Sequence, residues 1–168
     1  MTQLSFSSLL SDPESDGQFQ MHFEPGFPIG SIEPGDYFFD DYYCPKPDCD
    51  CQRVTLVVID EDGEEQAVIT YGWQPRSFYL DPGDGVIAEF DEEFADLITE
   101  GHLDPLDFQS ENASLFLSFF IDYFRDDPLF QDWLKRRYSL FKEAVAKKAP
   151  LELEDNTIIP FPKIRTQR

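Results

Sequence analysis

Basic residues, histidine and cysteine are all scarce in this chain of 168 residues. Lysine and arginine number 13 against 34 acidic residues, which leaves a formal net charge of −21. Because such a surface repels phosphate, most of the chain is excluded as a nucleic-acid-binding surface. No apolar run reaches the ~18 residues that a membrane-spanning helix needs, and no basic residue precedes the weak apolar stretch of the first ten residues. We therefore expect a cytoplasmic protein without a secretory signal, direct nucleic-acid binding or membrane association.

The shortage of basic residues is uneven along the chain. Residues 1–100 contain 23 acidic and 3 basic residues, whereas residues 101–168 contain 11 acidic and 10 basic residues. Six of the latter gather on one predicted helix: Lys135, Arg136, Arg137, Lys142, Lys147 and Lys148. They could form a docking face for an anionic partner or the solvated back of that helix. The strongly negative total charge favours a solvated helix face.

The composition is that of one folded domain. Hydrophobic residues make up 41% of the chain and aromatic residues 15%, enough to build a core and to argue against global disorder. The polar segment 1–16 is predicted to be a flexible N-terminus, and residues 150–168 a loose C-terminal tail. Residues 17–149 are expected to form a single α+β domain.

Alternating or β-branched segments in the N-terminal half predict four strands. They cover residues 18–23, 36–43, 52–60 and 66–71, and the last two are joined by the turn Glu61-Asp62-Gly63. Two further short strands are expected at residues 78–80 and 86–88.

Helical patterns dominate the C-terminal half. Asp91 can cap a helix to Thr99, Ser110 opens a helix to about Arg125, and Asp127-Pro128 begins a third helix that reaches about Lys148. Strands followed by helices are typical of the α+β class. We expect a small antiparallel sheet packed against about three C-terminal helices.

The three cysteines are close together in the sequence Cys44-Pro45-Lys46-Pro47-Asp48-Cys49-Asp50-Cys51. The two prolines prevent this segment from continuing a strand, and a bent backbone lets thiolates converge. Zinc prefers tetrahedral thiolate and imidazole ligands, so a Cys-x4-Cys-x-Cys turn can supply three of four. The sequence therefore predicts a zinc site.

The fourth ligand must come from elsewhere because there is no fourth cysteine. His22, His102, a carboxylate of Asp48 or Asp50, and water are the candidates; we favour His22, which lies on the polar side of its predicted strand. Unmetallated thiols and a redox or catalytic role are the alternatives to a metal site. A disulfide framework is disfavoured because the number of cysteines is odd and no export signal is expected.

Several segments resemble a family of uncharacterised bacterial proteins: Tyr42-Tyr43-Cys44-Pro45, Cys49-Asp50-Cys51-Gln52-Arg53-Val54, Tyr71-Gly72-Trp73 and Leu103-Asp104-Pro105-Leu106-Asp107-Phe108-Gln109-Ser110. The similarity covers roughly residues 35–142 and implies no activity. The cysteine segment also resembles the short bacterial metal knuckles of the SEC-C type, without their terminal Cys-His or Cys-Cys pair.

Three functions are compatible with these features. The first, which we favour, is an interaction or adaptor module for a protein partner, with its cysteine turn fixed by structural zinc. The second is a metal-dependent, hydrolase-like enzyme with an open metal position. The third is an acidic inhibitor that mimics nucleic acid. The sequence contains no P-loop, nucleophile elbow or dinucleotide-binding fingerprint, and it indicates no catalytic residue.

Overall fold

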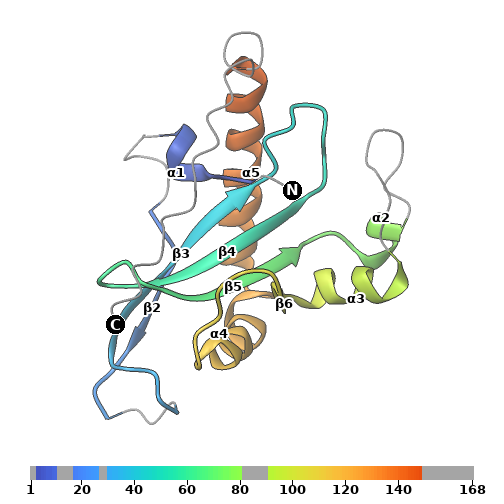
Figure 1. Ribbon diagram of the computed structural model, residues 1–168. Coiled ribbons are helices and arrows are strands. Elements are labelled where there is room, and N and C mark those ends of the chain that lie inside the picture. Colours follow the sequence, from blue (N-terminus) through green and yellow to red (C-terminus); the bar gives the residue numbers. More distant parts are fainter. Residues whose placement is uncertain (1–2, 11–16, 27–29, 81–90, 149–168) are drawn as a thin grey trace.

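The structure, a computed structural model, describes residues 3–10, 17–26, 30–80 and 91–148 (Figure 1). An antiparallel sheet from the N-terminal part is combined with several C-terminal helices, which confirms the α+β class. Within these ranges, no helix combines the length and the apolar character needed to cross a membrane. The elements are β1 (Leu4–Ser5), α1 (Phe6–Leu9), β2 (Gln20–Phe23), β3 (Gly35–Tyr43), β4 (Arg53–Asp60), β5 (Glu65–Gly72), α2 (Arg76–Leu80), α3 (Glu92–Glu100), β6 (His102–Leu103), α4 (Ala113–Phe119), the π-helix η1 (Phe120–Phe124) and α5 (Pro128–Lys148).

The sheet is built around three long strands, β3, β4 and β5. Its order is β1-β3-β4-β5-β6, and β2 also pairs with β3. Because β4 occupies one edge of β3, both short N-terminal strands share the other: β2 pairs with the first residues of β3 and β1 with the last. The predicted hairpin is confirmed, with β4 and β5 antiparallel and Gly63 at φ 80° in the turn.

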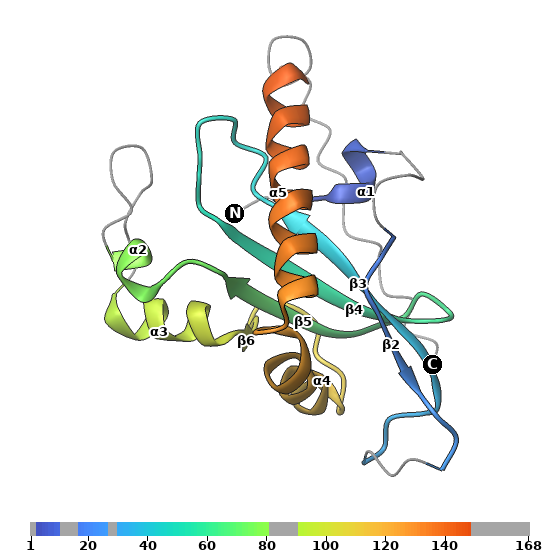
Figure 2. The same cartoon turned by 180° about the vertical axis from the view of Figure 1, so that it is seen from behind.

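Alternation along β3 decides which face of the sheet becomes the core. Tyr37, Phe39 and Tyr43 are buried on one face. They pack against helical aromatic residues at ring-centroid distances of 5.0 to 6.4 Å: Phe116, Phe120, Phe124, Phe130, Tyr138 and Phe141. Seen from behind, α5 lies across this face and α4 lies near its lower end (Figure 2). The sheet and α5 are therefore held together mainly by aromatic packing.

Side-chain caps set the beginnings of two predicted helices. The Asp127 carboxylate accepts a hydrogen bond from the Phe130 amide at 2.9 Å, and Pro128 occupies the first helical position of α5. Asp91 caps α3 in the same way, and Gly101 ends that helix at φ 86°. The helix expected over residues 110–125 is instead divided into α4 and η1, in which the Arg125 amide bonds to the Phe120 carbonyl, five residues back.

The prediction of a strand at residues 78–80 is wrong. These residues belong to α2, whose first turn is preceded by Pro75, and the Phe78 amide donates to the Pro75 carbonyl at 2.8 Å. Tyr79 is buried in a small second cluster with Ala95 and Ile98 of α3. The strand expected at residues 86–88 and the C-terminal tail 150–168 lie outside the described residues.

Part of the segment expected to be a flexible N-terminus is packed against the domain. Leu4 and Ser5 pair with the end of β3, and Phe6 is only 1% exposed. Residues 11–16 of that segment lie outside the description. The buried phenyl ring gives β1 and α1 a hydrophobic anchor that the polar composition of the segment obscures.

The prediction that all six basic residues of the third helix face solvent is wrong for Arg137. This residue is 5% exposed and forms an ion pair with the fully buried Asp41 of β3. The pairing is physically required because an isolated charge would be too costly to bury.

Candidate metal centre

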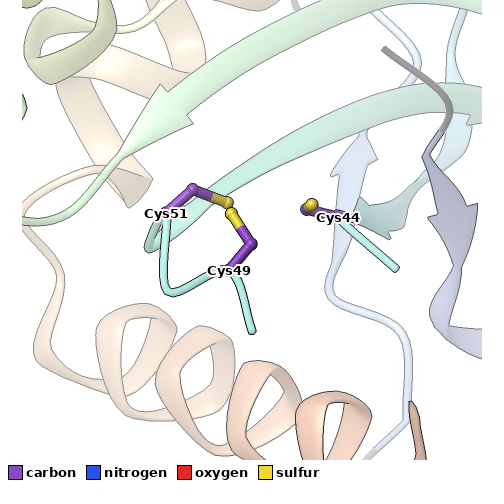
Figure 3. Close-up of side chains that lie close together, drawn as sticks. All are labelled: Cys44, Cys49 and Cys51. Atoms are coloured by element: carbon purple, nitrogen blue, oxygen red, sulfur yellow. The ribbon is translucent and has the colours of Figure 1, made fainter. Parts of the chain in front are cut away.

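The loop between β3 and β4, residues 44–52, brings the three cysteines together; we call it the cysteine loop. Cys44 directly follows β3, and Cys51 lies just before β4. Their Sγ atoms and that of Cys49 all lie within 4.8 Å of one another (Figure 3). Cys44 and Cys51 are buried, Cys49 is half-buried, and all three are free thiols. The prediction that this segment bends so that its thiols converge is therefore confirmed.

The backbone of the cysteine loop contains one turn and one residue in a left-handed conformation. The Cys49 amide donates to the Lys46 carbonyl at 3.2 Å, which closes a turn between the first two cysteines. Gln52 has a φ of 45°, a left-handed conformation that non-glycine residues seldom adopt. Such a conformation persists where surrounding contacts fix it.

Helix α5 supplies contacts on one side of the loop. The Lys142 ammonium donates to the Lys46 carbonyl at 2.6 Å. The Tyr138 hydroxyl donates to Asp50 Oδ1 at 2.9 Å and accepts from the Gln52 amide at 3.3 Å. Two side chains one turn apart on α5 thus hold both halves of the loop.

Residues that follow β5 in the chain contact the other side of the cysteine loop. The Tyr79 hydroxyl donates to the Gln52 carbonyl at 2.7 Å, while the Gln52 side-chain oxygen accepts from Trp73 Nε1 at 3.2 Å and from Gln74 Nε2 at 2.5 Å. Sequence reasoning missed Gln52, Tyr138 and Lys142 as supports of the site. No local signal identifies them, because the hydrogen-bond partners of Gln52 outside the loop are 21 to 86 residues away.

Electrostatics favours a first thiolate at Cys44. Its pKa is lowered mainly by the hydrogen bond from the Cys51 thiol, with further contributions from a backbone hydrogen bond at Lys46 and the Lys142 charge. The same hydrogen bond, together with burial, raises the pKa of Cys51. A metal ion must therefore displace protons from the group, which makes metal binding dependent on pH.

The group fits a thiolate-bound zinc ion. Tetrahedral zinc with Zn–S bonds of about 2.3 Å places its sulfur ligands about 3.8 Å apart. Since the three Sγ atoms already lie within 4.8 Å of one another, each pair needs to close by no more than about 1 Å. Two buried ligands would also shield the ion from water.

Neither histidine is brought to the cysteines. His22 of β2 pairs with Asp36 at the beginning of β3, and its Nδ1 lies 2.6 Å from the Asp36 carboxylate. Cys44 lies eight residues further along, about 27 Å for an extended strand. His102 Nδ1 lies 3.2 Å from the Leu97 carbonyl oxygen, at the end of α3. Among the described residues, only the three cysteines form a group suited to a metal ion.

An open hollow of about 410 Å³ adjoins the cysteine loop. It is lined by Pro47, Asp48, Cys49, Asp50, Tyr138, Ser139 and Lys142, so it lies between the loop and α5. Cys49 is the one cysteine that reaches it. The candidate centre therefore has a buried side at Cys44 and Cys51 and an accessible side at Cys49.

Comparison of the chain with protein-family models, with curated proteins and with solved structures gives no match. The resemblance to a family of uncharacterised bacterial proteins stays a prediction from the sequence.

Proposed function

We propose that Cys44, Cys49 and Cys51 bind one zinc ion and that the protein is an interaction module whose cysteine loop is fixed by this metal. The observation that carries the proposal is the convergence of the three Sγ atoms within 4.8 Å, two of them on buried residues. Thiolates select zinc among common divalent ions, whereas carboxylate and carbonyl oxygens suit magnesium and calcium. The ligand set therefore supports zinc.

A structural role for the metal is supported by the position of the loop. It connects the two central strands β3 and β4 and contacts α5 through Tyr138 and Lys142. A metal bound to three points of this loop would restrain the junction between the sheet and its main covering helix. Because such a site forms only in the folded chain, metal binding adds to the free energy of unfolding.

An interaction role is supported by apolar side chains that the fold leaves uncovered. Leu106 is 93% exposed, Leu129 74% and Tyr123 66%. Large apolar side chains exposed to this extent are available to contact a protein partner. None of these residues lines the hollow beside the cysteine loop.

Elemental analysis combined with thiol titration tests the metal site. We expect about one zinc ion per chain and three thiols that react only after a chelator is added. Cys44→Ser, Cys49→Ser and Cys51→Ser should each lower the metal content, whereas Val68→Ala, which removes buried volume from β5, should retain it. A metal-free protein with three freely reacting thiols would refute the proposed site.

Hydrogen exchange tests the structural role. Chelation should speed amide exchange in residues 44–52 and in the part of α5 that contacts them, and leave β2 unchanged, because β2 lies at the opposite end of β3. Exchange that is unaltered by metal removal would contradict a structural role.

A further inference from the structure

The chain has no cysteine beyond the three of the cysteine loop, and the structure places neither histidine beside them. The chain contains three cysteines and two histidines. His22 lies at the far end of β3, and His102 lies on β6 beside the end of α3. The remaining donors are therefore a carboxylate oxygen, water or a group from outside the chain.

The nearby carboxylates are poorly placed for this role. Asp50 has both oxygens engaged, Oδ1 with the Tyr138 hydroxyl at 2.9 Å and Oδ2 with Gln52 Nε2 at 3.0 Å. Neither Asp48 nor Asp50 places a carboxylate oxygen in the group that the three cysteines form. Binding through Asp50 would break the hydrogen bonds that tie the loop to α5.

The free coordination position has a defined direction. Cys44 is 2% exposed and Cys51 3%, so the protein closes the metal on their side. Cys49 lines the 410 Å³ hollow between the loop and α5. A fourth ligand must therefore approach through this hollow, past Ser139 and Lys142.

The negative charge of the proposed centre favours a neutral fourth ligand. Zinc with three thiolates carries a net charge of −1, and the hollow also contains the carboxylates of Asp48 and Asp50. Its one ammonium group, from Lys142, is bound to loop carbonyls. A further thiolate would raise the negative charge of the centre, whereas water or an imidazole would leave it unchanged. Of these two, the imidazole completes the Cys3His set of closed structural zinc sites.

We propose that the metal's fourth ligand is the imidazole of a histidine supplied by a partner protein through this hollow. The inference rests on the proposed zinc site and assigns that site a direct part in partner binding. It also explains why the accessible side of an otherwise buried centre lies next to an open depression.

Cobalt-substituted protein with free imidazole as the probe tests the proposal. Cobalt bound to three thiolates should show visible d–d bands that shift saturably as imidazole is added. Ser139→Trp, which fills the hollow, should weaken imidazole binding by about tenfold or more and leave cobalt affinity unchanged. The control Leu140→Trp, at a neighbouring exposed position that does not line the hollow, should behave as the unmodified protein. X-ray absorption of the zinc form with imidazole should show three sulfur ligands and one nitrogen ligand.

The outcomes separate this inference from the proposed function. Cobalt bands that are present but unaffected by imidazole would overturn the inference and leave the metal site intact. X-ray absorption that shows three sulfur ligands and one oxygen ligand, with the oxygen lost in Asp48→Asn, would overturn it in favour of an internal carboxylate ligand. Tighter binding of azide than of imidazole would refute the charge argument. Failure to bind cobalt, with all thiols reactive, would overturn both proposals.

Discussion

The buried ion pair between β3 and α5 makes a quantitative prediction about stability. Asp41 is fully buried, and Arg137 donates to its two oxygens from Nε at 2.7 Å and from a terminal nitrogen at 2.6 Å. The Tyr43 hydroxyl donates to the same carboxylate at 2.8 Å, and the Phe6 ring centroid lies 3.6 Å from the guanidinium carbon. Removing the Asp41 carboxylate would therefore break these hydrogen bonds from Arg137 and Tyr43.

Asp41→Ala should lower the free energy of unfolding by about 4 kcal/mol. Removing one partner of a buried ion pair typically costs about 3–5 kcal/mol because the remaining charge stays in a poorly solvated site. Folded domains have only about 5–15 kcal/mol of stability, so the variant should unfold at a much lower urea concentration. For a chain of this size, the melting temperature should fall by roughly 8–16 °C.

A double substitution provides the matched control. Asp41→Leu combined with Arg137→Met replaces both charges by apolar groups and should recover most of the lost stability, since no unpaired charge remains. Urea unfolding of Asp41→Leu, Arg137→Met and the double variant gives the coupling energy. A loss below about 1 kcal/mol for Asp41→Ala, the value typical of exposed pairs, would show that water solvates this pair and that the reasoning is wrong.

Three further predictions concern the loop and the sheet edge. Gly72→Ala should cost about 1–3 kcal/mol in chemical denaturation, because an added Cβ would lie 2.5 Å from Cζ of the buried Tyr79 ring; an unchanged midpoint would contradict this packing. Lys142→Met removes the ammonium that binds the loop carbonyls and should lower zinc affinity by about tenfold in a competition titration, whereas equal affinity would show that the loop needs no support from α5. The hydrogen bond with Asp36 raises the pKa of His22 above 6.5, so its stabilising contribution is present below pH 6.5 and lost as pH rises through the raised value. His22→Gln should remove this pH dependence, and an NMR titration of His22 that gives a pKa of 6.5 or lower would refute it.

Local patterns predicted much of the fold because they are tied to local physics. The β4–β5 hairpin follows from two β-branched segments around a glycine that adopts a positive φ. The beginning of α5 follows from an aspartate cap and a proline in the first turn. In the candidate site, the convergence of the cysteines followed from their spacing and the bends at the intervening prolines.

The remaining features depend on contacts between distant segments. Arg137 was expected at the surface because helix periodicity cannot reveal Asp41, 96 residues earlier. His22 was favoured as a ligand because it lies on the exposed face of its strand. Its pairing with Asp36, however, places it at the end of β3 that is away from the cysteines. Residues 78–80 were predicted to be a strand because their aromatic side chains have high strand propensity. Pro75, which precedes the first turn of α2, was not recognised as the start of a helix.

Helix α5 is the last described element of the chain, yet it contacts the first ones. Trp133 Nε1 donates to the Gly17 carbonyl, 116 residues away, and Arg137 lies under Phe6. Contacts of this sequence separation require large loops to close, which slows folding. During synthesis, β3, β4 and the cysteine loop emerge well before α5 can dock on them. Tyr138 and Lys142 thus reach the loop at a late stage, and a zinc ion that depends on them would be acquired at the end of folding rather than at its start.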